Sequence, residues 1–559
     1  MKPHGAIPGH TGERPGIALP LCLAVVPFAA VLCGFLLPYA AALSMGLRGG
    51  GITALSNPAL KSIAFFTLRQ ALWSVLCAVA LGLPGAWIIG SGNFRSSSFL
   101  RALTTIPFAM PSILVVLGFV LFFGNAGWAN TAAMRITGAN SGPFRILYRP
   151  SAIVLAHGFY NFPIVIRLVG TSIAQAKKSY APPAASLGAS GLVTALTILF
   201  PLAFPSLIAA SLLIFLYSFT SFAVVLVLGG GPAGTTLAVE IYRYARIFLD
   251  LPNAGALALL ETAIAGTAFL LYLLFEWKSA SQNLLAKPME KGSISLGGLC
   301  LGGVYLLTLF VLVIGPLLSI PLESFLYRPS RAALPQASLR WWRALGGGIG
   351  GMRPTGILPA LGRSLILAFL SATVACLLGI LSAGARYLSG PRTAIGYLIR
   401  IVATAPLVSS GIVLGLGWIA LYGRTRARAL PAVVMLHGIA ALPFAFNAIY
   451  EGFREIPPTM VHAAAVFGAA PLRRLITLEL PLLGSRIASA WGFAAALSLG
   501  ELNAILILGM EDWETLPLFI YRAVSAYRYG IACAAGTLLT GCCLAALLLS
   551  ERTGGTHGH

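Results

Sequence analysis

One acidic residue lies deep within an apolar segment of the sequence. Glu501 stands in LSLGELNAIL, two residues before Asn503, and we identify it as the one acidic residue near the middle of an apolar run. A carboxylate placed there needs an ionic partner or a water-filled cavity. Together with aromatic rings it could stabilise a flat cation, and the aromatic candidates are Tyr217, Phe219, Phe222 and Trp491. The alternative is a structural ion pair with Arg69, Arg167 or Arg363.

A pattern of alanine, glycine and proline occurs twice in the sequence. The first copy, PPAASLGASGLVTALTILFPL, begins at Pro182, and the second, HAAAVFGAAPLRRLITLELPL, begins at His462. Small residues let a short helix sit in a cleft of another protein, and glycine permits the turn that follows the helix. This chemistry suits a coupling element, formed by Ala184, Gly188, Ile198 and Pro201 in one copy and by His462, Ala463, Ala464, Gly468, Leu478 and Pro481 in the other.

The elements that must position these residues are membrane helices. The 559 residues are 58% hydrophobic and only 9% charged, which is too little charge to cover a soluble domain. About 20 apolar residues cross a bilayer, and twelve runs qualify. They lie at 17–45, 62–90, 101–124, 150–176, 203–228 and 253–276 in the first half, and at 296–319, 357–388, 399–423, 429–451, 484–510 and 530–550 in the second. We therefore predict an all-α polytopic protein in a lipid bilayer.

The two halves are copies of one unit. The sequence LAHGFYNFPIVI around His157 matches MLHGIAALPFAF around His437 at an offset of 280 residues, and the two motif segments share that offset. We predict two tandem six-helix domains, residues 1–280 and 281–559, related by an axis along the membrane normal. A substrate path would lie between them. The matching histidines are interpreted as packing residues and not as metal ligands.

Both motif segments resemble the EAA loop of bacterial ABC-importer permeases, whose pattern is EAA, three residues, Gly, nine residues and then I-x-L-P. In that family the short helix docks on a separate ATPase subunit and transmits its closure to the channel. The resemblance implies two ATPase copies, an extracytoplasmic substrate-binding protein, the bacterial inner membrane, and cytoplasmic termini. The chain departs from the pattern where the acid is expected, because Pro182 and His462 stand there; in the first copy Pro183 and Phe200 replace the usual Ala and Leu.

The chain itself is expected to bind no ATP and no other cofactor. It contains no G-x-x-x-x-G-K-[ST] segment, so a partner subunit would use the ATP and this chain would not be an enzyme. The net charge of +22 comes from scattered basic residues, which argues against a nucleic-acid partner.

The layout resembles the fused double-domain permeases that include the thiamine and ferric-iron importers. Two stretches, LGGGPAGTTLAVEIYRYARIF and ILGMEDWETLPLFIYRAVSAYRYG, are similar to the thiamine type. The resemblance implies transport of thiamine or its phosphates, with ferric iron as the alternative. A twelve-span secondary transporter would also contain two six-span copies, but it would not need paired EAA-like loops.

Overall fold

The computed structural model describes most of the chain. The described residues are 18–48, 57–91, 110–139, 141–229, 231, 234–281, 296–328, 335–346, 356–390, 393–510 and 513–554. Residues 282–295, between the two halves, and the start of the predicted third span lie outside these residues. Within the described part, the strands are limited to one antiparallel pair, β1 (Leu326–Tyr327) and β2 (Gln336–Ala337).

The first half consists of helices. In chain order they are α1 (Ala18–Val31), η1 (Leu32–Leu36), α2 (Leu37–Leu47), α4 (Pro58–Ser91), α6 (Ser112–Phe123), α7 (Trp128–Thr137), α8 (Pro150–Ser186), α9 (Gly191–Thr194), η2 (Ala195–Leu199), α10 (Phe200–Phe219), α11 (Ala223–Leu228), α12 (Leu237–Arg246) and α13 (Leu251–Ser281).

The second half consists of helices too, apart from the β1–β2 pair. Its helices are α14 (Leu296–Leu309), η4 (Phe310–Ile314), α15 (Gly315–Ser324), α16 (Arg340–Gly346), α17 (Leu358–Leu388), α18 (Ala394–Thr404), η5 (Ala405–Val408), α19 (Gly411–Ala427), α20 (Leu430–Glu455), α21 (Pro458–Val466), α22 (Pro471–Arg474), η6 (Leu475–Glu479), α23 (Leu480–Leu482), α24 (Gly484–Gly500), α25 (Asn503–Leu508), α26 (Leu516–Ser525) and α27 (Tyr529–Gly554).

The described helices match the predicted spans. Ten are long and apolar enough to cross a membrane, and two bent pairs raise the number to twelve. The bent pairs are 394–408 with 411–425, at 99°, and 471–482 with 484–500, at 69°. The prediction of an all-α polytopic membrane protein is confirmed. The 99° bend corrects the expectation of a simple span at 399–423, whereas the 69° bend lies at the start of the predicted span 484–510.

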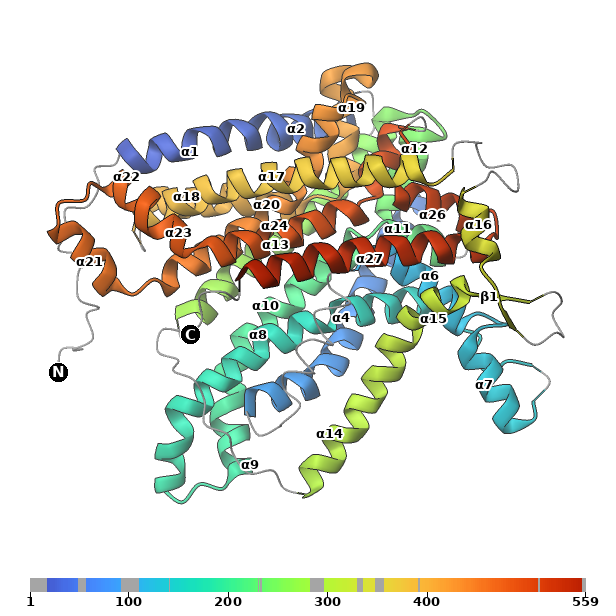
Figure 1. The fold of residues 1–559 in the computed structure, drawn as a ribbon, viewed down its shortest axis with the longest axis horizontal. Helices are drawn as coiled ribbons and strands as arrows, with labels where there is room; N and C mark the ends of the chain where they lie inside the picture. Colours follow the sequence, from blue (N-terminus) through green and yellow to red (C-terminus); the bar gives the residue numbers. More distant parts are fainter. Residues whose placement is uncertain are drawn as a thin grey trace.

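The first span of each half packs against the opposite half. In Figure 1, α1 runs along α17, and α2 lies against α19. In the reciprocal contact, α15 of the second half packs against α6 of the first. One-turn π-bulges, η1 and η4, interrupt both of these spans at matching places. The halves are therefore joined by exchanged helices as well as by a shared face.

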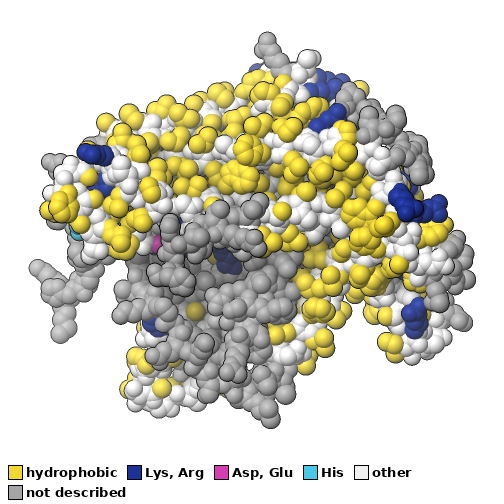
Figure 2. Space-filling view, viewed as in Figure 1, with side chains coloured by type: hydrophobic (Ala, Val, Ile, Leu, Met, Phe, Trp, Pro, Cys, Tyr) yellow, Lys and Arg dark blue, Asp and Glu magenta, His cyan; other side chains and the backbone are white. Residues whose placement is uncertain are grey.

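The outer surface is that of a protein in lipid. Figure 2 shows hydrophobic side chains over α1, α2 and α17, with most Lys and Arg side chains toward the edges of the molecule. Large side chains such as Phe65, Trp73 and Phe369 are about three-fifths exposed on helices that cross the membrane. The bilayer core contains no water, so apolar side chains exposed to lipid are stable there.

Candidate coupling loops and substrate path

The first motif segment forms a helix, a tight turn and a second helix. Helix α8 runs to Ser186, and Gly188 follows with a φ of +82°. The N–H of Ala189 donates to the carbonyl of Ala184 at 3.0 Å, and the N–H of Gly188 donates to Ala185 at 3.0 Å. This bond pattern is a Schellman cap, which satisfies the last carbonyls of a helix and needs a left-handed residue.

The second motif segment has the same turn. Helix α21 ends at Val466, and Gly468 has a φ of +76°. The N–H of Ala469 donates to the carbonyl of Ala464 at 3.0 Å, as in the first copy. Nothing lies within 4 Å of a Cβ added to either glycine, so the backbone angle and not space selects glycine.

Apolar side chains at the tips of both turns point away from the protein. Leu187 is 89% exposed, Val466 is 85% exposed and Phe467 is 90% exposed. These residues adjoin the loops and lie outside the apolar stretches of the spans. Exposed apolar patches of this kind are typical of contacts with another protein.

The helices before the two turns differ. Helix α20 ends at Glu455 and α21 starts at Pro458, whereas α8 continues without a break to Ser186. The expectation of a separate short helix in both copies is wrong for the first copy. Proline removes an N–H donor and disfavours helix at the preceding residue; the second copy has Pro457 and Pro458 where the first has lysines.

The remaining motif residues lie along these two loops. Ala184 is buried, Ala464, Ile198 and Leu478 are half-buried, and His462, Ala463, Pro201 and Pro481 are exposed. Ile198 and Leu478 lie in the π-bulges η2 and η6, which occupy matching positions. Each bulge leads into the fifth span of its half.

An ion pair anchors the second loop and has no counterpart in the first. The Nε of Arg474 donates to Oε1 of Glu479 at 2.8 Å, and Glu479 is completely buried. The equivalent residues of the first copy are Thr194 and Leu199. The sequence analysis missed this pair, although the difference between the copies could have revealed it.

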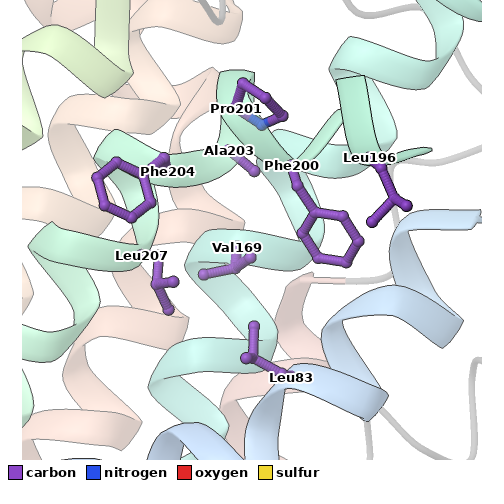
Figure 3. Close-up of a pocket in the computed structure, with 8 residues that line it drawn as sticks. All are labelled: Leu83, Val169, Leu196, Phe200, Pro201, Ala203, Phe204 and Leu207. Carbon is purple, nitrogen blue, oxygen red and sulfur yellow. The ribbon is translucent and has the colours of Figure 1, made fainter. Parts of the chain in front are cut away.

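A groove lies beside the end of the first loop (Figure 3). It has a volume of about 450 Å³ and is lined only by apolar residues of α4, α8, η2 and α10. They are Leu83, Val169, Leu196, Phe200, Pro201, Ala203, Phe204 and Leu207. Because Leu196 and Phe204 are more than half exposed, the groove opens to the outer surface of the protein. It includes none of the predicted residues of the substrate path.

The fifth span of each half is broken at the same place. Helix α10 ends at Phe219 and α11 starts at Ala223, while α24 ends at Gly500 and α25 starts at Asn503. Oε1 of Glu501 accepts the N–H groups of Asn503 at 2.8 Å and Ala504 at 3.2 Å. The carboxylate therefore caps α25.

The alternative of an ion pair for Glu501 is not found in the described part of the chain. None of the ion pairs there includes Glu501, and Arg69 and Arg363 lie over the rings of Phe66 and Trp513. Near the same break, Oδ1 of Asn503 is buried without a hydrogen bond to any described residue.

One tyrosine of the first half interacts with the Glu501 carboxylate, and a second tyrosine interacts with the first. Tyr160 of α8 interacts electrostatically with Glu501, and Tyr217 of α10 interacts with Tyr160. Tyr217 was predicted, whereas Tyr160 was missed. The signal for Tyr160 was its asymmetry, since Ala440 occupies the matching position of the second half.

The other predicted aromatic residues do not join this group. Phe219 and Phe222 are fully buried beside the break in the first half. The ring of Phe219 stacks on Phe215, and the ring of Phe222 is tilted against Tyr242. Trp491 donates to Oγ1 of Thr373 at 3.2 Å and meets Phe369, whose ring is 58% exposed. The structure thus places Trp491 on an outer face of α24 and not beside Glu501.

A second carboxylate within a span corrects the sequence analysis. Glu261 of α13 is 2% exposed, so Glu501 is not the one acidic residue in an apolar span. Glu261 lies in LALLETAIAG, where the surrounding residues could have revealed it.

Each of the two matching histidines lies close to a buried serine, but the two serines belong to different spans, Ser74 to α4 and Ser498 to α24. Nδ1 of His157 lies 3.3 Å from Oγ of Ser74, and Nδ1 of His437 lies 2.9 Å from Oγ of Ser498. Both rings are buried, and the described residues contain no metal-binding group of three His, Cys, Asp or Glu side chains. These contacts agree with the interpretation of packing residues.

Known proteins resemble the chain over most of its length. The thiamine transport system permease protein ThiP of Brucella suis is 28% identical over 519 residues, 91% of each chain. ThiP of Haemophilus influenzae is 27% identical over 498 residues, 86% of this chain and 87% of that protein. The spermidine/putrescine transport system permease protein PotB of Escherichia coli is 27% identical over 241 residues, which are 43% of this chain and 84% of PotB. No protein-family model matches the chain. The expected resemblance to the permeases of ABC transport systems, and to thiamine permeases among them, is confirmed over 91% of the chain.

Proposed function

We propose that this chain is the membrane-spanning permease subunit of an ATP-driven importer for thiamine or its phosphates. The observation that carries the proposal is the pair of equivalent loops, each with a glycine in the left-handed conformation and an exposed apolar tip. A partner that closes on both loops could move the two halves relative to each other. Alternating access between the halves would then carry the substrate inward.

The proposal assigns the energy source to partner subunits. Two ATPase copies, one for each loop, hydrolyse ATP, and an extracytoplasmic binding protein delivers the substrate. This chain binds no cofactor and hydrolyses nothing. Since the loops face the ATPase, they and both termini are cytoplasmic, and the chain lies in a bacterial inner membrane.

The substrate assignment rests on the relatives and on the chemistry near Glu501. Thiamine carries a cationic thiazolium ring, which a carboxylate and aromatic faces stabilise. Glu501, Tyr160 and Tyr217 offer both kinds of group at the break in the eleventh span. The names of the relatives in Brucella and Haemophilus support the same substrate.

Reconstitution tests the proposal directly. The chain is placed in proteoliposomes with its ATPase and binding protein, and uptake of labelled thiamine, thiamine phosphates and ferric iron is measured with and without ATP. We expect ATP-dependent accumulation of thiamine or its phosphates. Accumulation of ferric iron alone would assign the alternative substrate, and thiamine uptake driven by an ion gradient without ATP would identify a secondary transporter.

A further inference from the structure

The carboxyl group of Glu261 lies at the contact between the two halves. Glu261 is on α13 of the first half, and the hydroxyl of Ser410, in the second half, faces it. Ser410 Oγ accepts the N–H of Val413 at 3.3 Å, which leaves the hydroxyl hydrogen free to point at Glu261. Thr262 and Tyr39 share a hydrogen bond of 2.8 Å next to it. A cluster of polar side chains is thus enclosed by otherwise apolar helices.

The charge of Glu261 is not balanced by the described part of the protein. Its side chain is 2% exposed, neither carboxylate oxygen accepts a hydrogen bond of good geometry, and none of the ion pairs among the described residues includes it. The contrast on the same helix is Glu276, which pairs with Arg400. A buried carboxylate without a cation is unfavourable, so Glu261 is neutralised either by a proton or by a cation that enters from outside.

Glu261 and Glu501 approach two neighbouring residues of the chain, Ser410 and Gly411, at the same helix break. Between η5 and α19 the chain bends by 99°. Glu261 faces Ser410 in this bend, and Oε1 of Glu501 lies 3.5 Å from the Cβ position of the next residue, Gly411. One carboxylate comes from each half of the molecule, and both reach the break between η5 and α19. Such a break can rearrange when the halves separate.

We propose that Glu261 is a second substrate-binding carboxylate, which with Glu501 forms a site for an organic cation at this bend. The inference rests on the proposed function, since it places the cation of the importer's substrate. Two carboxylates on opposite halves give the cation a partner on each side of the path. Because Glu261 is enclosed here, the substrate reaches it only as the halves move apart.

The uptake experiment uses the full chain with its ATPase and binding protein in proteoliposomes. Glu261→Gln removes the charge and keeps the shape, and Glu261→Asp keeps the charge. We expect Glu261→Gln to raise the KM for labelled thiamine by about tenfold, because one favourable charge contact of moderate strength is lost. Glu261→Asp keeps the charge, so its KM should lie between those of the wild type and Glu261→Gln. The matched control is Glu276→Gln on the same helix, which should lower kcat and leave KM unchanged.

A labelling experiment on the wild-type complex covers the case in which a variant does not fold. N,N′-dicyclohexylcarbodiimide modifies carboxyl groups in apolar surroundings, and mass spectrometry locates the adduct. During ATP turnover, excess thiamine should reduce modification of Glu261. Wild-type KM in Glu261→Gln, or labelling of Glu261 that thiamine does not change, would overturn the inference and leave the proposed function standing. Failure of the wild-type protein to accumulate thiamine would overturn both.

Discussion

Gly417 of α19 lies directly against the backbone of Pro38 in α2, so that a Cβ on Gly417 would overlap the Pro38 carbonyl. The equivalent contact on the other side joins Gly118 of α6 to Pro316 of α15, where an added Cβ would lie 2.6 Å from the carbonyl oxygen. Each glycine belongs to the third span of one half, and each proline to the first span of the other. Small residues let membrane helices approach this closely, and here they hold the exchanged spans in place.

Gly417→Ala should therefore destabilise the contact between the halves. The neighbouring atoms are backbone and cannot rotate away, so we expect a loss of about 1–3 kcal/mol, as for other overpacked sites. Thermal unfolding of the purified protein in detergent measures the change. Gly541→Ala is the control, because nothing lies within 4 Å of its Cβ position. Equal melting temperatures for the two variants would contradict this role of Gly417.

Gly468 should be required for coupling because of its backbone angle. An L-residue at a φ of +76° costs about 1–2 kcal/mol, so Gly468→Val should distort the turn and lower ATP-dependent uptake. Gly468→Asn should be milder, since asparagine tolerates this conformation best. The Gly188 position should respond in the same order.

The control for the turn is Gly484→Ala, which has open space around its Cβ and no positive φ. ATP hydrolysis and uptake are measured on the same proteoliposomes. Full uptake by the double variant Gly188→Val with Gly468→Val, correctly inserted and bound to its ATPase, would refute the assignment of these loops as coupling elements.

Local features of the sequence were enough to predict where most spans lie and where the two glycine turns occur. The length of each apolar run determines whether it crosses the bilayer, and the glycines at 188 and 468 mark the two turns. Both signals are contained within a short segment. The motif residues could for this reason be placed on loops before any tertiary contact was known.

Features that depend on tertiary contacts could not be predicted in this way. Hydropathy does not show that Glu501 supplies acceptors for the N–H groups of Asn503 and Ala504, so the break after Gly500 was missed. No local signal shows that the first span of each half crosses to the other. The surroundings of Trp491 could not be predicted for the same reason, because they depend on which face of α24 packs against α17.

Replacing the Glu501 carboxylate should separate its two roles. Glu501→Gln keeps an oxygen that can cap α25 and removes the charge, so we expect an uptake of thiamine about tenfold lower, as for loss of one charge contact, with little change in melting temperature. Glu501→Ala should lose the cap as well, a further cost of about 1 kcal/mol. Wild-type uptake by Glu501→Gln would exclude Glu501 from the substrate path.

The ion pair between Glu276 and Arg400 should control how readily the halves separate. Glu276 lies near the end of α13 in the first half and Arg400 lies in α18 of the second, and both side chains are less than one-third exposed. Removing one partner leaves the other without compensation, at a cost of roughly 2 kcal/mol for a partly buried pair. Either Glu276→Gln or Arg400→Gln should therefore lower the rate of ATP-driven uptake.

A double-mutant cycle tests whether the pair acts as a unit. The reversed pair, Glu276→Arg with Arg400→Glu, should recover part of the uptake rate that each single reversal loses, because opposite charges again face each other. The KM for thiamine should stay constant throughout, since neither residue belongs to the proposed cation site. If the losses of uptake rate from the two single reversals simply add in the double variant, the contact between the halves does not depend on this pair.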